Sequence, residues 1–169
     1  MEYLIRHVKV SDAQAVLDFV SQVAGESDNL TFGEGEFNMP LEKEVEFLKA
    51  LEDDDNAIML LAFDGEKVIG NLSYSGGKRV RTRHTGEFGV SVRKDYWGQG
   101  IGSALIKTMI DWAKSSDYCE KINLKVREDN FKAISLYMKL GFRVEGVVKK
   151  DMKINGAYVN AIFMGLDIK

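Results

Sequence analysis

The chain has 169 residues, of which 45% are hydrophobic and 29% charged, as is usual for one domain with its own core. Its formal net charge is −3, which argues against a surface built to bind nucleic acid. Cys119 is the only cysteine, so an internal disulfide and a cysteine metal cluster are excluded, and the two histidines lack the spacing of metal ligands. No apolar run approaches the roughly 18 residues of a membrane span, and the first ten residues lack the apolar stretch of a signal peptide, so we expect a cytoplasmic protein with no membrane partner.

The spacing of apolar residues predicts strands and helices along the whole chain. The expected elements are a strand at 4–9, a helix at 13–24, a long polar loop at 25–40, a helix at 41–51, strands at 57–63, 68–74 and 85–92, a helix at 100–115, a strand at 122–126, a helix at 130–140, and strands at 142–154 and 157–166. Ser11 and Gln14 fit a capping box at the start of the first helix. Asn155-Gly156 is a strong hairpin signal.

The order β-α-α-β-β-β-α-β-α-β-β mixes hairpin connections with helical ones. We therefore expect the α/β class in its mixed α+β form, as a single domain over residues 1–169. The central sheet should be mixed and mostly antiparallel, with about seven strands and helices on both faces.

Three glycines, Gly98, Gly100 and Gly102, stand at alternate positions between a strand and a helix. Glycine weakens a helix by roughly 1 kcal/mol relative to alanine, so bare backbone must be needed there. The first N–H groups of a helix lack internal partners and its dipole is positive at that end, so this arrangement predicts a phosphate site. The alternative is a connector that lets the helix pack closely on the strand. The spacing G-x-G-x-G fits neither a dinucleotide fold nor a P-loop.

The segment VSVRKDYWGQGIGSAL, residues 90–105, resembles motif A of the GNAT superfamily, the acyl-CoA-dependent N-acyltransferases. Trp97 stands where that family usually has Arg or Gln, but the family's contact is chiefly through backbone N–H groups. The resemblance implies that strand residues pair with the pantetheine arm of coenzyme A: Val90, Ser91 and Val92. It also implies that the following turn binds the pyrophosphate through Gly98, Gln99, Gly100, Ile101, Gly102 and Ser103.

The segment INLKVREDNFKAISLYMKLGF, residues 122–142, resembles motif B of the same family. The resemblance implies that Asn130 contacts the pantetheine amides and that Tyr137 stands beside the thioester sulfur. These two residues are seven apart, which would place them on one face of a helix. Ser135, at a less regular position of the motif, is a further cofactor-binding candidate. In the closing hairpin Asn160 stands where relatives often have Asp, a difference that would alter contacts of the acceptor or of a dimer.

Transfer of an acyl group from a thioester to an amine needs a proton for the thiolate and a base for the ammonium. Tyr137 fits the acid role, because a phenol with a pKa near 10 stays protonated at pH 7; a core tyrosine is the alternative. Glu87 is the candidate base, since the family often uses a Glu there, whereas a solvated surface glutamate is the alternative. Gly89 marks either a bulge that opens the site or a packing position.

The resemblance implies an acetyl-CoA-dependent N-acetyltransferase that acetylates a primary amine, most simply that of a small molecule, without a metal and without a covalent enzyme intermediate. A protein N-terminal or lysine acetyltransferase and a non-catalytic CoA-binding module are the alternatives. Relatives are often dimers, so a homodimer is also expected. The acceptor stays open, because the loop at 25–40 is acidic and favours a cationic amine, whereas the segment at 78–84 is basic. The acidic residues of the first loop are Glu26, Asp28, Glu34 and Glu36.

Overall fold

The computed structural model describes residues 2–169. Its strands are β1 (Leu4–His7), β2 (Ala57–Asp64), β3 (Lys67–Gly76), β4 (Thr85–Val92), β5 (Lys121–Arg127), β6 (Arg143–Ile154) and β7 (Ala157–Asp167). Its α-helices are α1 (Ala13–Ala24), α2 (Leu41–Glu52), α3 (Ile101–Ser115) and α4 (Phe131–Lys139), with short 3-10 helices η1 (Val10–Asp12) and η2 (Lys94–Tyr96). The order of strands and α-helices is the predicted one.

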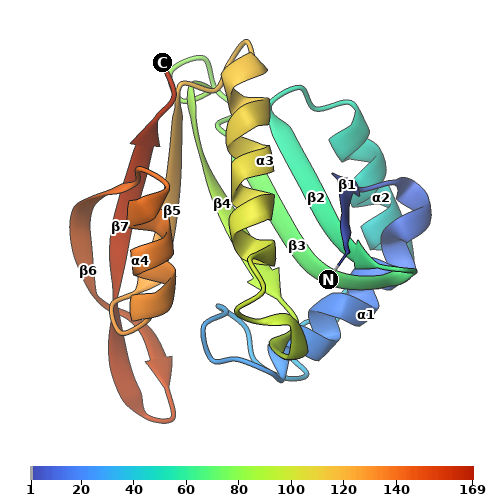
Figure 1. Cartoon of the computed structure of the whole chain (residues 1–169), viewed down its shortest axis with the longest axis horizontal. Helices are drawn as coiled ribbons and strands as arrows, with labels where there is room; N and C mark the ends of the chain where they lie inside the picture. The colour runs from blue at the N-terminus through green and yellow to red at the C-terminus, as the bar shows by residue number, and fades with distance from the viewer. Residues whose placement is uncertain (1) are drawn as a thin grey trace.

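Across the described residues, seven strands form one sheet in the order β1-β2-β3-β4-β5-β7-β6 (Figure 1). Neighbouring strands run antiparallel, apart from β4 and β5, which are parallel. The prediction of a mixed, mostly antiparallel sheet is therefore confirmed.

Helices cover both faces of the sheet, as predicted, with α1 and α2 on one face and α3 and α4 on the other (Figure 1). Neighbouring residues of β2 pack into the cores on opposite faces of the sheet, because side chains alternate along a strand. Leu60 packs with Leu105 of α3, whereas Leu61 packs with Phe19 of α1 and Leu48 of α2. The double-sided core fixes the sheet between its two helical layers.

The start of α1 differs from the predicted capping box. Asp12 accepts a hydrogen bond from the Lys9 amide at 2.7 Å and two from the Arg6 guanidinium at 2.7 and 2.9 Å. Gln14 donates to Asp18 instead of reaching back to Ser11. The bonds from Arg6 hold the pKa of Asp12 below its usual value. The capping box was wrong because the 3-10 turn η1 already begins at Val10, so Ser11 lies inside a helical turn and Lys9 takes the N-cap position.

The parallel pair β4–β5 is short, and beyond it the two strands separate; this separation is called the splay. It pairs only Thr85–Glu87 with Lys121–Asn123. Beyond Glu87, β4 continues beside β3 as far as Val92, while β5 continues beside β7 as far as Arg127. The two strands accordingly lie together at one end and part towards the other (Figure 1). The inner edge of β4 is left without a strand partner.

Gly89 lies on this free part of β4 and fulfils neither expectation made for it. The β3–β4 register is regular through the pair Ser73–Gly89, so there is no bulge. A Cβ at Gly89 would have nothing within 4 Å, so close packing does not require glycine there either.

The closed end of the splay should be sensitive to a single methyl group at Gly86. A Cβ there would collide with the backbone oxygen of Ser75 and the hydroxyl of the fully buried Tyr74. We expect Gly86→Ala to lower the free energy of unfolding by about 1–3 kcal/mol, as other overpacked sites do. The matched control on the same strand, Gly89→Ala, should stay within about 0.5 kcal/mol of the parent. Urea denaturation followed by circular dichroism measures both, and equal stabilities would contradict the crowding at Gly86.

Candidate functional site

The glycine turn joins η2 to α3 and explains two of its three glycines by backbone conformation. Gly98 and Gly100 have φ angles of +77° and +80°, in the left-handed region that favours glycine. Gly102 lies inside the helix, and a Cβ there would approach only Val92, at 3.9 Å. No close helix–strand contact demands these glycines. The turn instead presents backbone that no side chain covers.

The first turn of α3 offers free N–H donors. Ala104 donates to the carbonyl of Gly100 at 2.9 Å, and no side chain caps the amides before it. The N–H groups of Ile101, Gly102 and Ser103 therefore stand without intrahelical partners at the positive end of the helix. The buried Ile101 side chain anchors this turn in the core. Such a donor set fits the pyrophosphate of coenzyme A.

Side chains from separate parts of the fold hold the turn that precedes the glycines. Three bonds do so: from Trp97 Nε1 to the Val92 carbonyl (2.7 Å), from the Tyr96 hydroxyl to Asp64 (2.9 Å), and from the Lys94 amide to Glu26 (2.7 Å). They connect the turn to β4, to the end of β2 and to the loop after α1. Trp97, which departs from the Arg or Gln usual at this position of the motif, thus helps to hold the turn against β4.

Along the free part of β4, successive residues direct their backbone N–H and C=O groups alternately towards β3 and towards the splay. The Arg93 N–H donates to the Ile69 carbonyl on the β3 side at 2.9 Å, and in an antiparallel ladder every second residue bonds to the same neighbour. Ser91 therefore turns its backbone groups towards β3, whereas Val90 and Val92 turn theirs towards the splay. The bond from Trp97 to the Val92 carbonyl agrees with this direction. The geometry separates Ser91 from the two valines, which fit an extended pantetheine arm.

Tyr137 lies on α4 and packs across the splay against β4. Its ring meets Phe88 with centroids 6.0 Å apart at 85°, and Phe142 with centroids 6.0 Å apart at 64°. Burial raises the pKa of Tyr137 to about 12. None of the described side chains accepts a hydrogen bond from its hydroxyl. The phenol is therefore held in place and kept protonated at neutral pH.

Asn130 lies at the very start of α4, where the sequence placed it. It precedes α4 as the N-cap, and its Oδ1 accepts from the Ala133 amide at 3.3 Å. As the N-cap it still belongs half to the helix, because its carbonyl accepts the first helical bond, from the Ile134 amide at 3.0 Å. Within residues 2–169 nothing accepts from the Asn130 Nδ2, which stays available as a donor. Ser135 is exposed on the outer surface of α4.

Glu87 is exposed and is the last residue of β4 that pairs with β5. Because side chains alternate, Glu87 lies on the α1–α2 face of the sheet, opposite Phe88 and hence opposite Tyr137. The structure thus does not bring the two catalytic candidates into contact. It places them on the two sides of one strand, which suits an acyl donor on one side and an acceptor on the other.

Comparison with known proteins decides the family. The family model described as "Acetyltransferase (GNAT) family" matches residues 26–142, which is more than half of the chain. The chain belongs to the GNAT acetyltransferase family.

Similar proteins within the family include two curated enzymes from Escherichia coli K12. An L-amino acid N-acetyltransferase is 30% identical over 163 residues, covering 96% of each chain. A spermidine N(1)-acetyltransferase is 33% identical over 132 residues, covering 76% of this chain and 69% of the relative. The crystal structure of a GNAT acetyltransferase from Streptococcus pneumoniae has a TM-score of 0.95 at 31% identity, covering 99% of this chain and 100% of that one. GNAT enzymes take their acetyl group from acetyl-CoA.

The loop at 25–40 lies across the open end of the splay between β4 and β5 (Figure 1). On one side Glu26 accepts from the amide of Lys94, just beyond β4, at 2.7 Å. On the other side Arg127, at the end of β5, donates to the Asp28 carbonyl at 2.9 Å. The sequence predicted the loop and its acidity, but its bridging role depends on partners far away in the chain.

No helix within residues 2–169 has the length and apolar character needed to cross a membrane. Among the same residues, no three His, Cys, Asp or Glu side chains gather closely enough to hold a metal ion.

Asn160 ties β7 to two neighbouring segments. Its Oδ1 accepts from the Lys150 amide at 2.9 Å, and its Nδ2 donates to Glu128 at 3.1 Å. Lys150 has a φ of +56°, so the bond supports an unfavourable backbone conformation. An amide is needed because one end of this side chain accepts and the other donates. The residue therefore makes contacts inside the chain, where the sequence had suggested acceptor or dimer contacts.

Asn160→Asp should destabilise the protein at neutral pH, because the new carboxylate would face that of Glu128. We expect a loss of about 0.5–1 kcal/mol of unfolding free energy, since Glu128 is exposed and screened. Repulsion raises the pKa of the carboxyl pair in the folded state, so the loss should shrink as pH falls and one carboxyl takes up a proton. Adding Glu128→Gln should restore stability at neutral pH. Urea unfolding of the three proteins tests this, and a double variant no more stable than the single one would contradict it.

Proposed function

We propose that this protein transfers the acetyl group of acetyl-CoA directly to the primary amine of a small molecule. Family membership supports acetyl transfer to an amino group. The observation that carries direct transfer is the splay between β4 and β5, which leaves the inner edge of β4 without a strand partner beyond Glu87. Donor and acceptor can meet at that strand without a covalent enzyme intermediate.

Acetyl-CoA would lie along the splay on the side of α3 and α4. Its pyrophosphate would accept hydrogen bonds from the glycine turn and from the amides of Ile101, Gly102 and Ser103. Its pantetheine arm would pair with the free backbone groups of Val90 and with the Val92 N–H, and Asn130 would donate through Nδ2. The acetyl thioester would then lie close to Phe88 and Tyr137.

The chemistry needs one new bond, one broken bond and two proton movements. The amine nitrogen bonds to the carbonyl carbon of the thioester, and the carbon–sulfur bond breaks. Glu87 accepts the proton that the amine loses, directly or through water, and Tyr137 supplies a proton to the departing sulfur. The raised pKa of Tyr137, about 12, keeps this proton in place until the thiolate forms.

The acceptor would approach from the α1–α2 face, past the loop at 25–40. Glu26 and Glu36 are engaged in backbone hydrogen bonds, whereas Asp28 and Glu34 keep exposed carboxylates. These charges favour an amine that is cationic at neutral pH. A loop bridging the open end narrows the entrance, which favours a small amine over a protein N-terminus or lysine.

We also propose that the chain acts as a cytoplasmic homodimer. β6 is an edge strand of the sheet, and Val144, Val147 and Val148 on it are exposed. An unpaired edge with apolar side chains is a surface that a second copy would cover. The single cysteine is a free thiol, which agrees with a reducing compartment where acetyl-CoA is available.

The acid role of Tyr137 can be separated from its packing role by Tyr137→Phe, which keeps the ring and removes the hydroxyl. We expect kcat for CoA thiol release to fall about 100-fold, within the range known for general acid catalysis. Because the phenol is fully protonated from about pH 6 to about pH 9, the ratio of parent to variant should be constant there. Calorimetry should find acetyl-CoA bound as tightly as before.

Two results would count against this account. Unchanged turnover in Tyr137→Phe would remove the acid role alone. No thiol release by the unaltered protein with any amine of a panel containing amino acids, polyamines and aminoglycosides would contradict small-amine acetylation itself.

Glu87→Gln tests the base. The variant should lose about 10-fold to 100-fold in kcat/KM near neutral pH, with partial recovery at high pH, where the free amine forms without help. Glu66→Gln, the same change in the exposed β2–β3 turn, is the matched control and should behave as the parent. A loss in Glu87→Gln that is equal at all pH values would assign this side chain to binding instead.

A further inference from the structure

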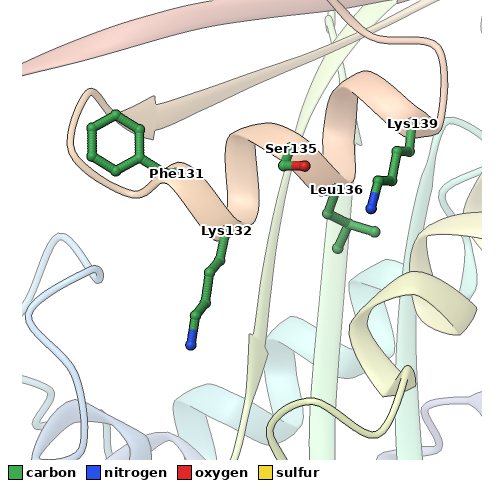
Figure 2. A pocket seen from close by; sticks show the side chains of 5 residues that line it. All are labelled: Phe131, Lys132, Ser135, Leu136 and Lys139. Atoms are coloured by element: carbon green, nitrogen blue, oxygen red, sulfur yellow. The ribbon is translucent and has the colours of Figure 1, made fainter.

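The two faces of the sheet differ beside the free part of β4. On the α3–α4 face, α4 carries a hollow of about 410 Å³ whose lining includes two exposed lysines (Figure 2). The residues that line it are Phe131, Lys132, Ser135, Leu136 and Lys139. On the α1–α2 face, the strand itself is bare at Gly89, which is exposed and has no side chain. The two sides of β4 thus offer different surfaces to a ligand.

The glycine at position 89 is not required by the fold of the chain. It does not belong to the glycines that have a positive φ angle, and the strand is regular through its pair with Ser73. A Cβ there would have nothing within 4 Å. Glycine weakens a strand, because it adds conformational freedom to the unfolded chain and brings no side chain to pack in the folded one. The close approach of a ligand is the physical reason that remains for a bare position in this strand.

Polar side chains surround this bare position. Phe88 belongs to the core on the α3–α4 face. Because side chains alternate along a strand, Glu87, Gly89 and Ser91 therefore face α1 and α2. Ser73 of β3 lies directly opposite Gly89 in the register. Other serine hydroxyls within residues 2–169 take part in hydrogen bonds, whereas those of Ser73 and Ser91 make none and are left for a ligand.

We propose that Gly89 is a specificity-determining residue, which admits an acceptor whose amino group is attached to a branched carbon. This rests on the proposed function, in which the thioester lies close to Phe88 and the amine arrives from the α1–α2 face. The amine nitrogen would approach the strand beside Gly89, and a branch on the carbon next to it would occupy the space of the missing side chain. An uncharged polar branch fits, because Ser73 and Ser91 offer hydroxyl groups that donate and accept, whereas the Glu87 carboxylate repels an anion. The acceptor class is accordingly an amine with a hydroxyl group on the neighbouring carbon.

Two isomeric amines test the proposal on the full chain with acetyl-CoA as donor. One is 2-amino-1-butanol, which is branched at the carbon that carries the amine, and the other is 4-amino-1-butanol, which is unbranched there. By CoA thiol release, the unaltered protein should show a kcat/KM about 10-fold or more higher for the branched isomer. In Gly89→Ala, the added methyl group should lower kcat/KM about 10-fold or more for the branched isomer and less than about 3-fold for the unbranched one.

Gly146→Ala is the matched control, because Gly146 is also a strand glycine at which a Cβ would have nothing within 4 Å, and it should keep the parent preference. Calorimetric titration should find acetyl-CoA bound by Gly89→Ala as tightly as by the parent, which separates an effect on the acceptor from an effect on the donor. An equal loss for the two isomers in Gly89→Ala would overturn the role of Gly89. So would an unaltered protein that acetylates other amines of the panel but does not favour the branched isomer. If the unaltered protein releases no thiol with any amine, the proposed function fails instead, so the two failures are distinguishable.

Discussion

The early parting of β4 from β5 is the constraint on which the rest of the site depends. Backbone N–H and C=O groups need partners, and a strand edge inside a sheet normally finds them in the next strand. Beyond Glu87 the inner edge of β4 has no such strand. The carbonyl of Val92 is satisfied by the indole of Trp97, and Val90 keeps its groups for a ligand. An extended arm rich in amides is the chemistry that such an edge recognises.

An aromatic cluster packs α4 against β4 across the splay. Phe88, Tyr137 and Phe142 come from β4, from α4 and from the start of β6, with ring centroids 5.8–6.0 Å apart. Their packing holds α4 beside β4 where no strand ladder could. The Tyr137 ring is thus fixed by apolar contacts, while none of the described side chains bonds to its hydroxyl. Desolvation by the same packing raises the pKa of that hydroxyl and keeps it protonated at neutral pH.

Much of this could be predicted from the sequence because it depends on local patterns. Apolar periodicity gave the strands and helices, and the motif around Gly98 and Gly100 indicated the turn whose left-handed residues the structure shows. The errors concern choices between competing partners. Ser11 lies inside the turn η1, where the carboxylate of Asp12 binds the Lys9 amide and Arg6 of the preceding strand. Such competition depends on three-dimensional proximity, which the spacing of residues does not reveal.

The bonds that complete the site join residues even farther apart in the chain. Glu26 meets the Lys94 amide and Arg127 meets the Asp28 carbonyl, so no local pattern could predict that the acidic loop bridges the splay. These bonds also explain how charge is divided across β4. Free amides and the lysines of α4 stand on one side, while Glu87 and the remaining loop carboxylates stand on the other. Groups that attract anions and groups that attract cations therefore lie on opposite sides of β4, and both border the segment after Glu87 that has no partner in β5.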